Sequence, residues 1–213
     1  NGINVYSHEV SAMSHRIECF FDCSSPWTYL AFEYLQTRMA GLDVSIEWRP
    51  ILVGGIFNTV NPSVYQSRET PVPLKAAYMR KDLADWARLV GIGIHFPPPV
   101  FPVNSVKAMR GAYLAIDRGC LVPYARAVFK SYWTELVDIS QDAALADIAT
   151  SVGFTREEFF DGIASASCKE RLRQATEEVV ARGGFGSPTL FLDGDDMYFG
   201  NDRIDLMRSR ITL

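Results

Sequence analysis

Cysteine and histidine are scarce in this sequence, which has four cysteines and three histidines among 213 residues. Cysteines this few and this scattered do not make the disulfide framework of a small secreted domain, and the histidines lack zinc-ligand spacing. No apolar stretch approaches the roughly 18 residues that a membrane helix needs. The first twelve residues, NGINVYSHEVSA, lack the basic start and apolar centre of a secretory signal, and Met13 is an alternative start. We therefore expect a protein of the reducing cytoplasm.

An excess of positive charge is also missing. Lysine and arginine total 21 against 25 aspartates and glutamates, which gives a net charge of −4. Proteins that bind nucleic acid through its phosphates carry a basic patch or stripe. We therefore expect neither a nucleic acid nor a membrane as partner. The 48% of hydrophobic and 22% of charged residues are typical of a globular protein.

The N-terminal region predicts a strand, a helix and a second strand. Residues 17–22 form a short apolar run, typical of a buried strand. Ser25 and Pro26 then match the preferred cap and first position of a helix, which we expect to run to Met39. Residues 43–52 alternate apolar and polar side chains before Pro50. Such a unit with short joints favours a parallel strand pair.

The middle of the sequence differs from the N-terminal region in its composition and in its helical periodicity. Residues 53–73 are rich in glycine and proline and predict a loop, whereas residues 74–182 are mostly helical, interrupted by a proline-rich loop at 96–103. Signals for helix starts lie at Asn104, Pro123, Ser140, Thr155 and Ser167, and the last two fit the capping-box pattern.

The end of the sequence returns to strands. Residues 189–192 and 197–199 flank an Asp-Gly turn, and Asn201 is expected to cap a final helix. The predicted fold is therefore α/β: a thioredoxin-like β-α-β…β-β-α domain with a large all-helical insertion. We expect residues 14–56 and 183–213 to form the discontinuous thioredoxin-like domain and residues 57–182 the inserted helical domain.

The corner between the first strand and helix reads Ser25-Pro26-Trp27-Thr28. In thioredoxin-like proteins a redox Cys-x-x-Cys motif occupies this corner, and here hydroxyls stand in place of both sulfurs. Disulfide exchange at this corner is thereby excluded. Two interpretations of Ser25 remain open: an ordinary helix cap, or a hydroxyl beside a ligand sulfur at a helix N-terminus, which favours anions.

Two C-terminal motifs likewise have both a structural and a functional interpretation. Ser187-Pro188 is either a plain loop or a cis-proline turn that leaves backbone groups free for a peptide-like ligand. In Phe199-Gly200-Asn201-Asp202, a ligand carboxylate would lie at the helix start while Asp202 pairs with an ammonium group. A ligand with a carboxylate and an ammonium group at one end has the end group of an amino acid. Glutathione is a thiol peptide with such an end.

Four segments together resemble the 2-hydroxychromene-2-carboxylate isomerases, which are grouped with the kappa-class glutathione transferases in the DsbA-like thioredoxin superfamily. The segments are FDCSSPWTYLAFE (21–33), DLADWARLVGI (82–92), GFGSPTLFL (184–192) and FGNDR (199–203). The likeness runs from about residue 16 to the C-terminus, although residues 49–57 resemble the kappa transferases as much as the isomerases. The resemblance also implies a homodimer.

The resemblance implies a role for each matching residue. Ser25 would be catalytic and lie beside the glutathione sulfur, and Lys75 and Asn104 would face the aromatic substrate. The other residues implied in glutathione binding are Asn61, Ser187, Pro188, Phe199, Gly200, Asn201 and Asp202. Ser25 would donate a hydrogen bond to a thiolate whose pKa the helix dipole lowers.

Three functions fit these observations. The first is a glutathione-dependent cis–trans isomerase of an aromatic-degradation pathway such as that of naphthalene, acting by reversible thiolate addition. The second is a kappa-like transferase that conjugates glutathione to electrophiles and so consumes it. The third is a non-catalytic module that binds a thiol peptide without activating the thiol.

Overall fold

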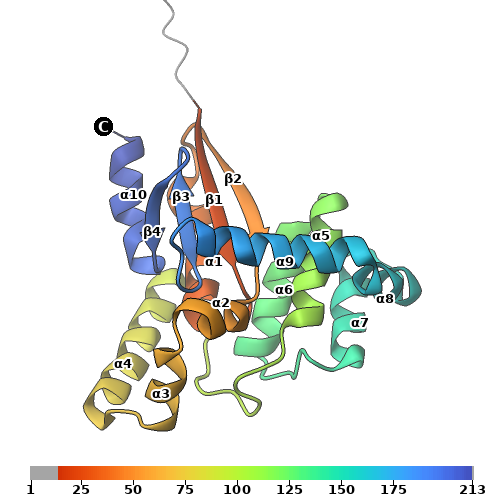
Figure 1. Ribbon diagram of the computed structural model, residues 1–213, viewed down its shortest axis with the longest axis horizontal. Coiled ribbons are helices and arrows are strands. Elements are labelled where there is room, and N and C mark those ends of the chain that lie inside the picture. Colours follow the sequence, from red (N-terminus) through yellow and green to blue (C-terminus); the bar gives the residue numbers. More distant parts are fainter. Residues whose placement is uncertain (1–13, 213) are drawn as a thin grey trace, which may run out of the picture.

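The computed structural model describes residues 14–212, so the expectation about residues 1–12 and Met13 lies outside the described part (Figure 1). Its centre is a four-stranded sheet in the order β2-β1-β3-β4. The strands are β1 (His15–Phe21), β2 (Val44–Pro50), β3 (Thr189–Leu192) and β4 (Asp196–Phe199). β1 is parallel to β2 and antiparallel to β3, and β4 is antiparallel to β3. The predicted strands, the parallel pair and the thioredoxin-like order are confirmed.

Helix α1 (Pro26–Met39) covers one face of the sheet together with α10 (Ile204–Ile211). Ile17, Cys19 and Phe21 alternate along β1 and are almost completely buried. The ring of Phe21 lies 6.2 Å from that of Phe32 on α1, measured between centroids. This apolar face fixes the position of α1, and with it the position of Ser25 at its start.

The inserted helices lie between β2 and β3 in the sequence, and Figure 1 shows most of them grouped at one end of the sheet. They are α2 (Val53–Val60), α3 (Ser63–Glu69), α4 (Pro73–Val90), α5 (Val106–Asp117), α6 (Leu121–Trp133), α7 (Asp142–Ser151), α8 (Arg156–Ala164) and α9 (Ala166–Ala181). The helical insertion is thus confirmed, whereas the domain boundaries at residues 57 and 182 stay a prediction.

The prediction of a loop over residues 53–73 is wrong, since this segment forms α2 and α3. Val53 and Ile56 are buried on one face of α2, and Gly55 lies close against Thr176 of α9. Tertiary packing thus outweighs the low helix propensity of the Gly54-Gly55 pair. Only short breaks remain, around Asn61 at the end of α2 and at residues 70–72 between α3 and α4.

Several predicted helix starts are displaced. The capping box at Thr155 is confirmed, but the one at Ser167 is wrong, because Ser165 caps α9 and accepts a hydrogen bond from Cys168 N at 3.2 Å. Asn201 makes no cap hydrogen bond. It begins a short 3-10 turn over Asn201–Arg203, and α10 starts only at Ile204.

The other displaced starts shift by one to two residues. Ser105 occupies the N-cap position of α5, although Asn104 Oδ1 accepts a hydrogen bond from Val106 N at 3.1 Å. Helix α6 begins at Leu121, ahead of Pro123. Gln141 precedes α7, and the Ser140 side chain bonds to Asp138 instead. Shifts of one or two residues lie within the usual variation of helix ends.

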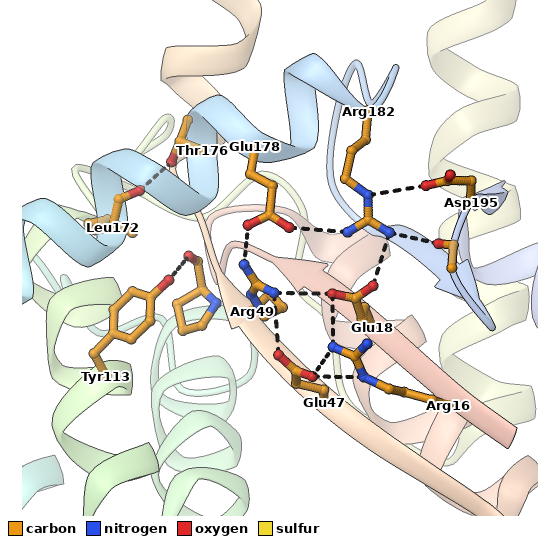
Figure 2. Close-up of polar contacts among 12 residues, drawn as sticks. Arg16, Glu18, Glu47, Arg49, Tyr113, Leu172, Thr176, Glu178, Arg182 and Asp195 are labelled. Carbon is orange, nitrogen blue, oxygen red and sulfur yellow. Dashed lines mark hydrogen bonds and ion pairs between the residues drawn. The ribbon is translucent and has the colours of Figure 1, made fainter. Parts of the chain in front are cut away.

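Helix α9 crosses the opposite face of the sheet and is tied to it by a charged network (Figure 2). The Glu18 side chain of β1 is buried and pairs with Arg49 Nη1 at 3.1 Å and with Arg182 Nη2 at 2.9 Å. Arg49 also pairs with Glu178 of α9. Because a buried carboxylate needs such partners, the network fixes α9 over β1 and β2.

We expect Gly111→Ala to destabilise the fold by about 1–3 kcal/mol through overpacking. A Cβ at Gly111 would lie 2.2 Å from Tyr124 Oη and 2.7 Å from the Phe159 ring, both buried. Gly54→Ala is the matched control, because a Cβ at that helical position meets nothing within 4 Å. Urea unfolding of both variants checks this, and equal midpoints for the two would contradict it.

Candidate active site

The start of α1 holds Ser25, whose hydroxyl group makes two hydrogen bonds. Ser25 is in an extended conformation, and its Oγ accepts a hydrogen bond from Thr28 N at 3.3 Å. The same hydroxyl donates to the Ser187 carbonyl oxygen at 3.3 Å. Pro26 follows in the first turn, which contains no acidic residue, so nothing there offsets the positive end of the helix dipole. The predicted cap is confirmed, and it directly contacts the second motif.

The Ser187-Pro188 peptide bond is cis, and the Ser187 side chain lies within the same corner. Its Oγ accepts a hydrogen bond from Asp22 N at 3.0 Å and lies 2.8 Å from Thr28 Oγ1. Ser25, Thr28 and Ser187 therefore form a continuous set of hydroxyl contacts between segments more than 150 residues apart. The fold brings the first two motifs together.

Asp22 is a buried carboxylate behind this corner that sequence reasoning missed. Its oxygens accept hydrogen bonds from Ser24 N and Val53 N, each at 2.9 Å, and from Ser105 Oγ at 3.1 Å. Burial raises the pKa of the Asp22 carboxyl above its ordinary value, and these hydrogen bonds oppose part of that rise. The available signal was an ionisable residue at the end of an apolar strand. Asp22 joins the corner to the starts of α2 and α5.

Asn61 is brought to the same place from the end of α2. Its Nδ2 donates to the Phe185 carbonyl oxygen at 3.1 Å, two residues before Ser187. Around this loop lie three partly exposed rings. The centroids of Phe185 and Phe199 are 4.4 Å apart, and a Cβ at Gly186 would lie 2.9 Å from the Phe199 ring and 3.9 Å from Phe57. The predicted Asn61 and Phe199 thus flank the loop, together with Phe57, which was not among the predicted site residues.

Asn201 has an unsatisfied side chain. It is 3% exposed, and its Nδ2 makes no hydrogen bond with the described residues. The preceding Gly200 has φ of +100° and donates its N–H to the Pro188 carbonyl oxygen at 3.2 Å. The Asp202 carboxylate is exposed and pairs with Arg203. A buried amide without an acceptor is costly, so Asn201 is a position of unfavourable local energy next to the cis-proline loop.

Lys75 and Asn104 are not joined to the other predicted residues by any hydrogen bond or ion pair within residues 14–212. Lys75 is exposed on the first turns of α4 and makes no hydrogen bond or ion pair with the described part of the chain. Asn104 is exposed, and its side-chain oxygen is used at the start of α5. Their predicted role toward a substrate is therefore a proposal.

One of the four cysteines, Cys23, lies close to this corner in the sequence. All four are free, and Cys23, two residues before Ser25, is buried. Burial raises the pKa of the Cys23 thiol well above its ordinary value, so it stays protonated and unreactive. Its carbonyl oxygen accepts a hydrogen bond from Trp133 Nε1 at 2.8 Å, which holds the strand end in place. Residues 14–212 contain neither a cluster suited to a metal ion nor a helix that could cross a membrane.

Comparison with known proteins gives one family and several relatives. The model of the DSBA-like thioredoxin domain matches residues 16–212. The 2-hydroxychromene-2-carboxylate isomerase of Pseudomonas putida is 30% identical over 198 residues, covering 91% of this chain and 92% of the relative. Human glutathione S-transferase kappa 1 is 28% identical over 205 residues, covering 90% and 88% of the two chains. A solved 2-hydroxychromene-2-carboxylate isomerase superposes with a TM-score of 0.77 at 26% identity, covering 92% and 94% of the chains.

Proposed function

The chain belongs to the DSBA-like thioredoxin family, and on that premise we propose that it is a glutathione-dependent cis–trans isomerase. The substrate we propose is 2-hydroxychromene-2-carboxylate or a related intermediate of aromatic degradation, after the named activity of its relatives. One observation carries the proposal: at the start of α1 the residues that face the cis-proline loop are hydroxyls, with Ser25 and Thr28 in place of a redox pair. We further propose a homodimer, from the resemblance alone, and a cytoplasmic location, from the few and scattered cysteines.

The residues around the corner fit glutathione. Asn201 would lie at the carboxylate of the γ-glutamyl end, at the start of the turn that leads into α10, and Asp202 would pair with the ammonium group. Phe199 and Gly200 would border that end, and the backbone of Ser187 and Pro188 would pair with the peptide. Asn61 would hold the neighbouring loop in register through its bond to Phe185.

When bound, glutathione supplies a thiolate that adds to an unsaturated substrate carbon and leaves again after rotation about the resulting single bond. Ser25 would turn its hydroxyl proton from the Ser187 carbonyl oxygen toward the sulfur. The N-terminus of α1, which has no acidic residue in its first turn, would stabilise the same negative charge. Ser25 is not itself a nucleophile here, because no histidine among residues 14–212 contacts it as a base.

We assign the substrate side to Lys75 and Asn104. Lys75 would neutralise the substrate carboxylate or a developing phenolate, and Asn104 would orient a substrate oxygen. Both side chains are exposed and therefore accessible to an incoming substrate.

An absorbance assay of 2-hydroxychromene-2-carboxylate, with and without glutathione, tests the proposal. We expect conversion that requires glutathione and leaves its concentration unchanged. Consumption of glutathione would favour the second candidate, a transferase, which the likeness to the kappa transferases supports. Glutathione binding without an ultraviolet thiolate band at neutral pH would instead indicate a non-catalytic binding module.

A further inference from the structure

The guanidinium group of Arg68 on α3 lies between aromatic rings from two separate segments. Its Cζ is 5.6 Å from the ring centroid of Phe57 on α2 and 5.3 Å from that of Phe101 in the proline-rich loop. Both distances fall within the roughly 6 Å range of cation–π contacts. Arg68 therefore spans the space between α2 and the proline-rich loop.

Phe57 approaches the candidate site from the side of the cis-proline loop. A Cβ at Gly186 would lie 3.9 Å from its ring. Gly186 directly precedes Ser187, whose carbonyl oxygen accepts the hydrogen bond from Ser25. The Phe57 ring therefore lies close to the loop whose Ser187 carbonyl oxygen accepts the hydrogen bond from Ser25.

Phe101 approaches the same corner from the inserted helices. Its ring centroid is 6.3 Å from that of Trp133, whose Nε1 donates to the Cys23 carbonyl oxygen. Cys23 is two residues before Ser25. Of the two rings that contact Arg68, Phe57 thus neighbours the cis-proline loop, and Phe101 packs against the tryptophan that holds the strand end before Ser25.

The charge of Arg68 is unbalanced. Its side chain is exposed and forms no hydrogen bond or ion pair within residues 14–212. By contrast, Arg126 makes a two-pronged bond to Glu33 at 2.7 and 2.8 Å. A planar guanidinium group matches a carboxylate in this bidentate way, and aromatic neighbours lower the competition from water.

We propose that Arg68 is a specificity-determining residue that binds the carboxylate of an aromatic substrate beside Ser25, with the rings of Phe57 and Phe101 covering the substrate ring. The proposal rests on the proposed function and adds a residue to it: with Arg68 on the substrate carboxylate, Lys75 is left to neutralise the developing phenolate. A flat aromatic acid fits these surroundings because its ring is buried against two rings while its carboxylate meets the cation. The glycyl carboxylate of glutathione fits this position less well, because the peptide has no aromatic ring to pack against Phe57 and Phe101.

Calorimetric titration tests this without turnover. The ligands are 2-naphthoate and its uncharged methyl ester, each added to protein saturated with S-methylglutathione. For Arg68→Gln we expect the Kd of 2-naphthoate to rise about 10- to 100-fold, as for loss of one charge-assisted bidentate contact, and the Kd of the ester to stay unchanged. For Arg68→Lys, the Kd of 2-naphthoate should lie between the values for the wild type and for Arg68→Gln. The matched control is Arg156→Gln, which removes an arginine 5.3 Å from the Phe160 ring on α8 and should bind like the wild type.

Three results would overturn the proposal. They are equal affinity of the wild type and Arg68→Gln for 2-naphthoate, absence of 2-naphthoate binding to the wild type, and loss of S-methylglutathione binding in Arg68→Gln, which would assign Arg68 to the peptide carboxylate. Because binding is measured without reaction, the titration can be interpreted even if the isomerase assay shows no activity.

Discussion

Ser25→Ala is expected to lower kcat of the proposed isomerisation by about 10²–10³-fold while leaving the fold intact, in line with removal of one donor from a charge-stabilising site. In the structure this hydroxyl caps α1 and donates to Ser187. Its loss costs the cap about 1 kcal/mol of stability, which a domain of this size tolerates. Steady-state kinetics with glutathione and thermal unfolding measure the two effects separately.

The pH profile separates thiolate stabilisation from a structural effect of the same substitution. If Ser25 donates to the bound thiolate, kcat/KM should rise with pH through the pKa of that thiol. In Ser25→Ala the midpoint should move toward the free thiol value of about 8.5, because the ionised form loses a hydrogen bond. An unshifted midpoint would assign Ser25 to capping alone.

Ser165→Ala is the matched control for Ser25→Ala. Ser165 caps α9 through a hydrogen bond from Cys168 N at 3.2 Å, close to the 3.3 Å of the Ser25 cap. It should lose similar stability and keep full activity. Equal losses of activity in both variants would contradict the catalytic assignment of Ser25.

Asp22→Leu is expected to lower the free energy of unfolding by about 3–5 kcal/mol, because a side chain of similar size without acceptors leaves several buried donors unpaired. Ser24 N, Val53 N and Ser105 Oγ all donate to this carboxylate. Urea unfolding checks the loss. An effect below about 1 kcal/mol would mean that these donors find other partners.

Asp22→Asn gives a milder variant with a pH signature. Burial raises the folded-state pKa of the Asp22 carboxyl, so between the unfolded and the folded pKa the native protein binds more protons than the unfolded chain. The contribution of this group is therefore fully present below the unfolded pKa of about 3.9 and falls as pH rises through the folded pKa. The stability of the wild type relative to Asp22→Asn should consequently be greater near pH 4 than at pH 7. The opposite trend would show that the hydrogen bonds to the carboxylate outweigh its burial.

Local features of the fold followed from the sequence. Strand β1, helix α1 and the Ser25 cap depend on apolar spacing and on a cap within three residues of its partner. Helices α2 and α3 did not follow, because glycine and proline signals suggested a loop while Val53 and Ile56 found a core to pack against. The predicted helix cap at Asn201 is also wrong, because its buried side chain makes no cap hydrogen bond and a 3-10 turn precedes α10.

The sequence by itself determined that the corner at Ser25 holds no sulfur and that a strand, helix and strand precede a helical insertion. These are properties of neighbouring residues, and neighbours interact whatever the rest of the chain does. Only the tertiary structure decided that Ser25 meets Ser187, that Asp22 joins three segments, and that Arg68 lies between two rings. Such contacts join residues far apart in the chain, and they form only where the packing of the whole core offsets the entropy of bringing those segments together.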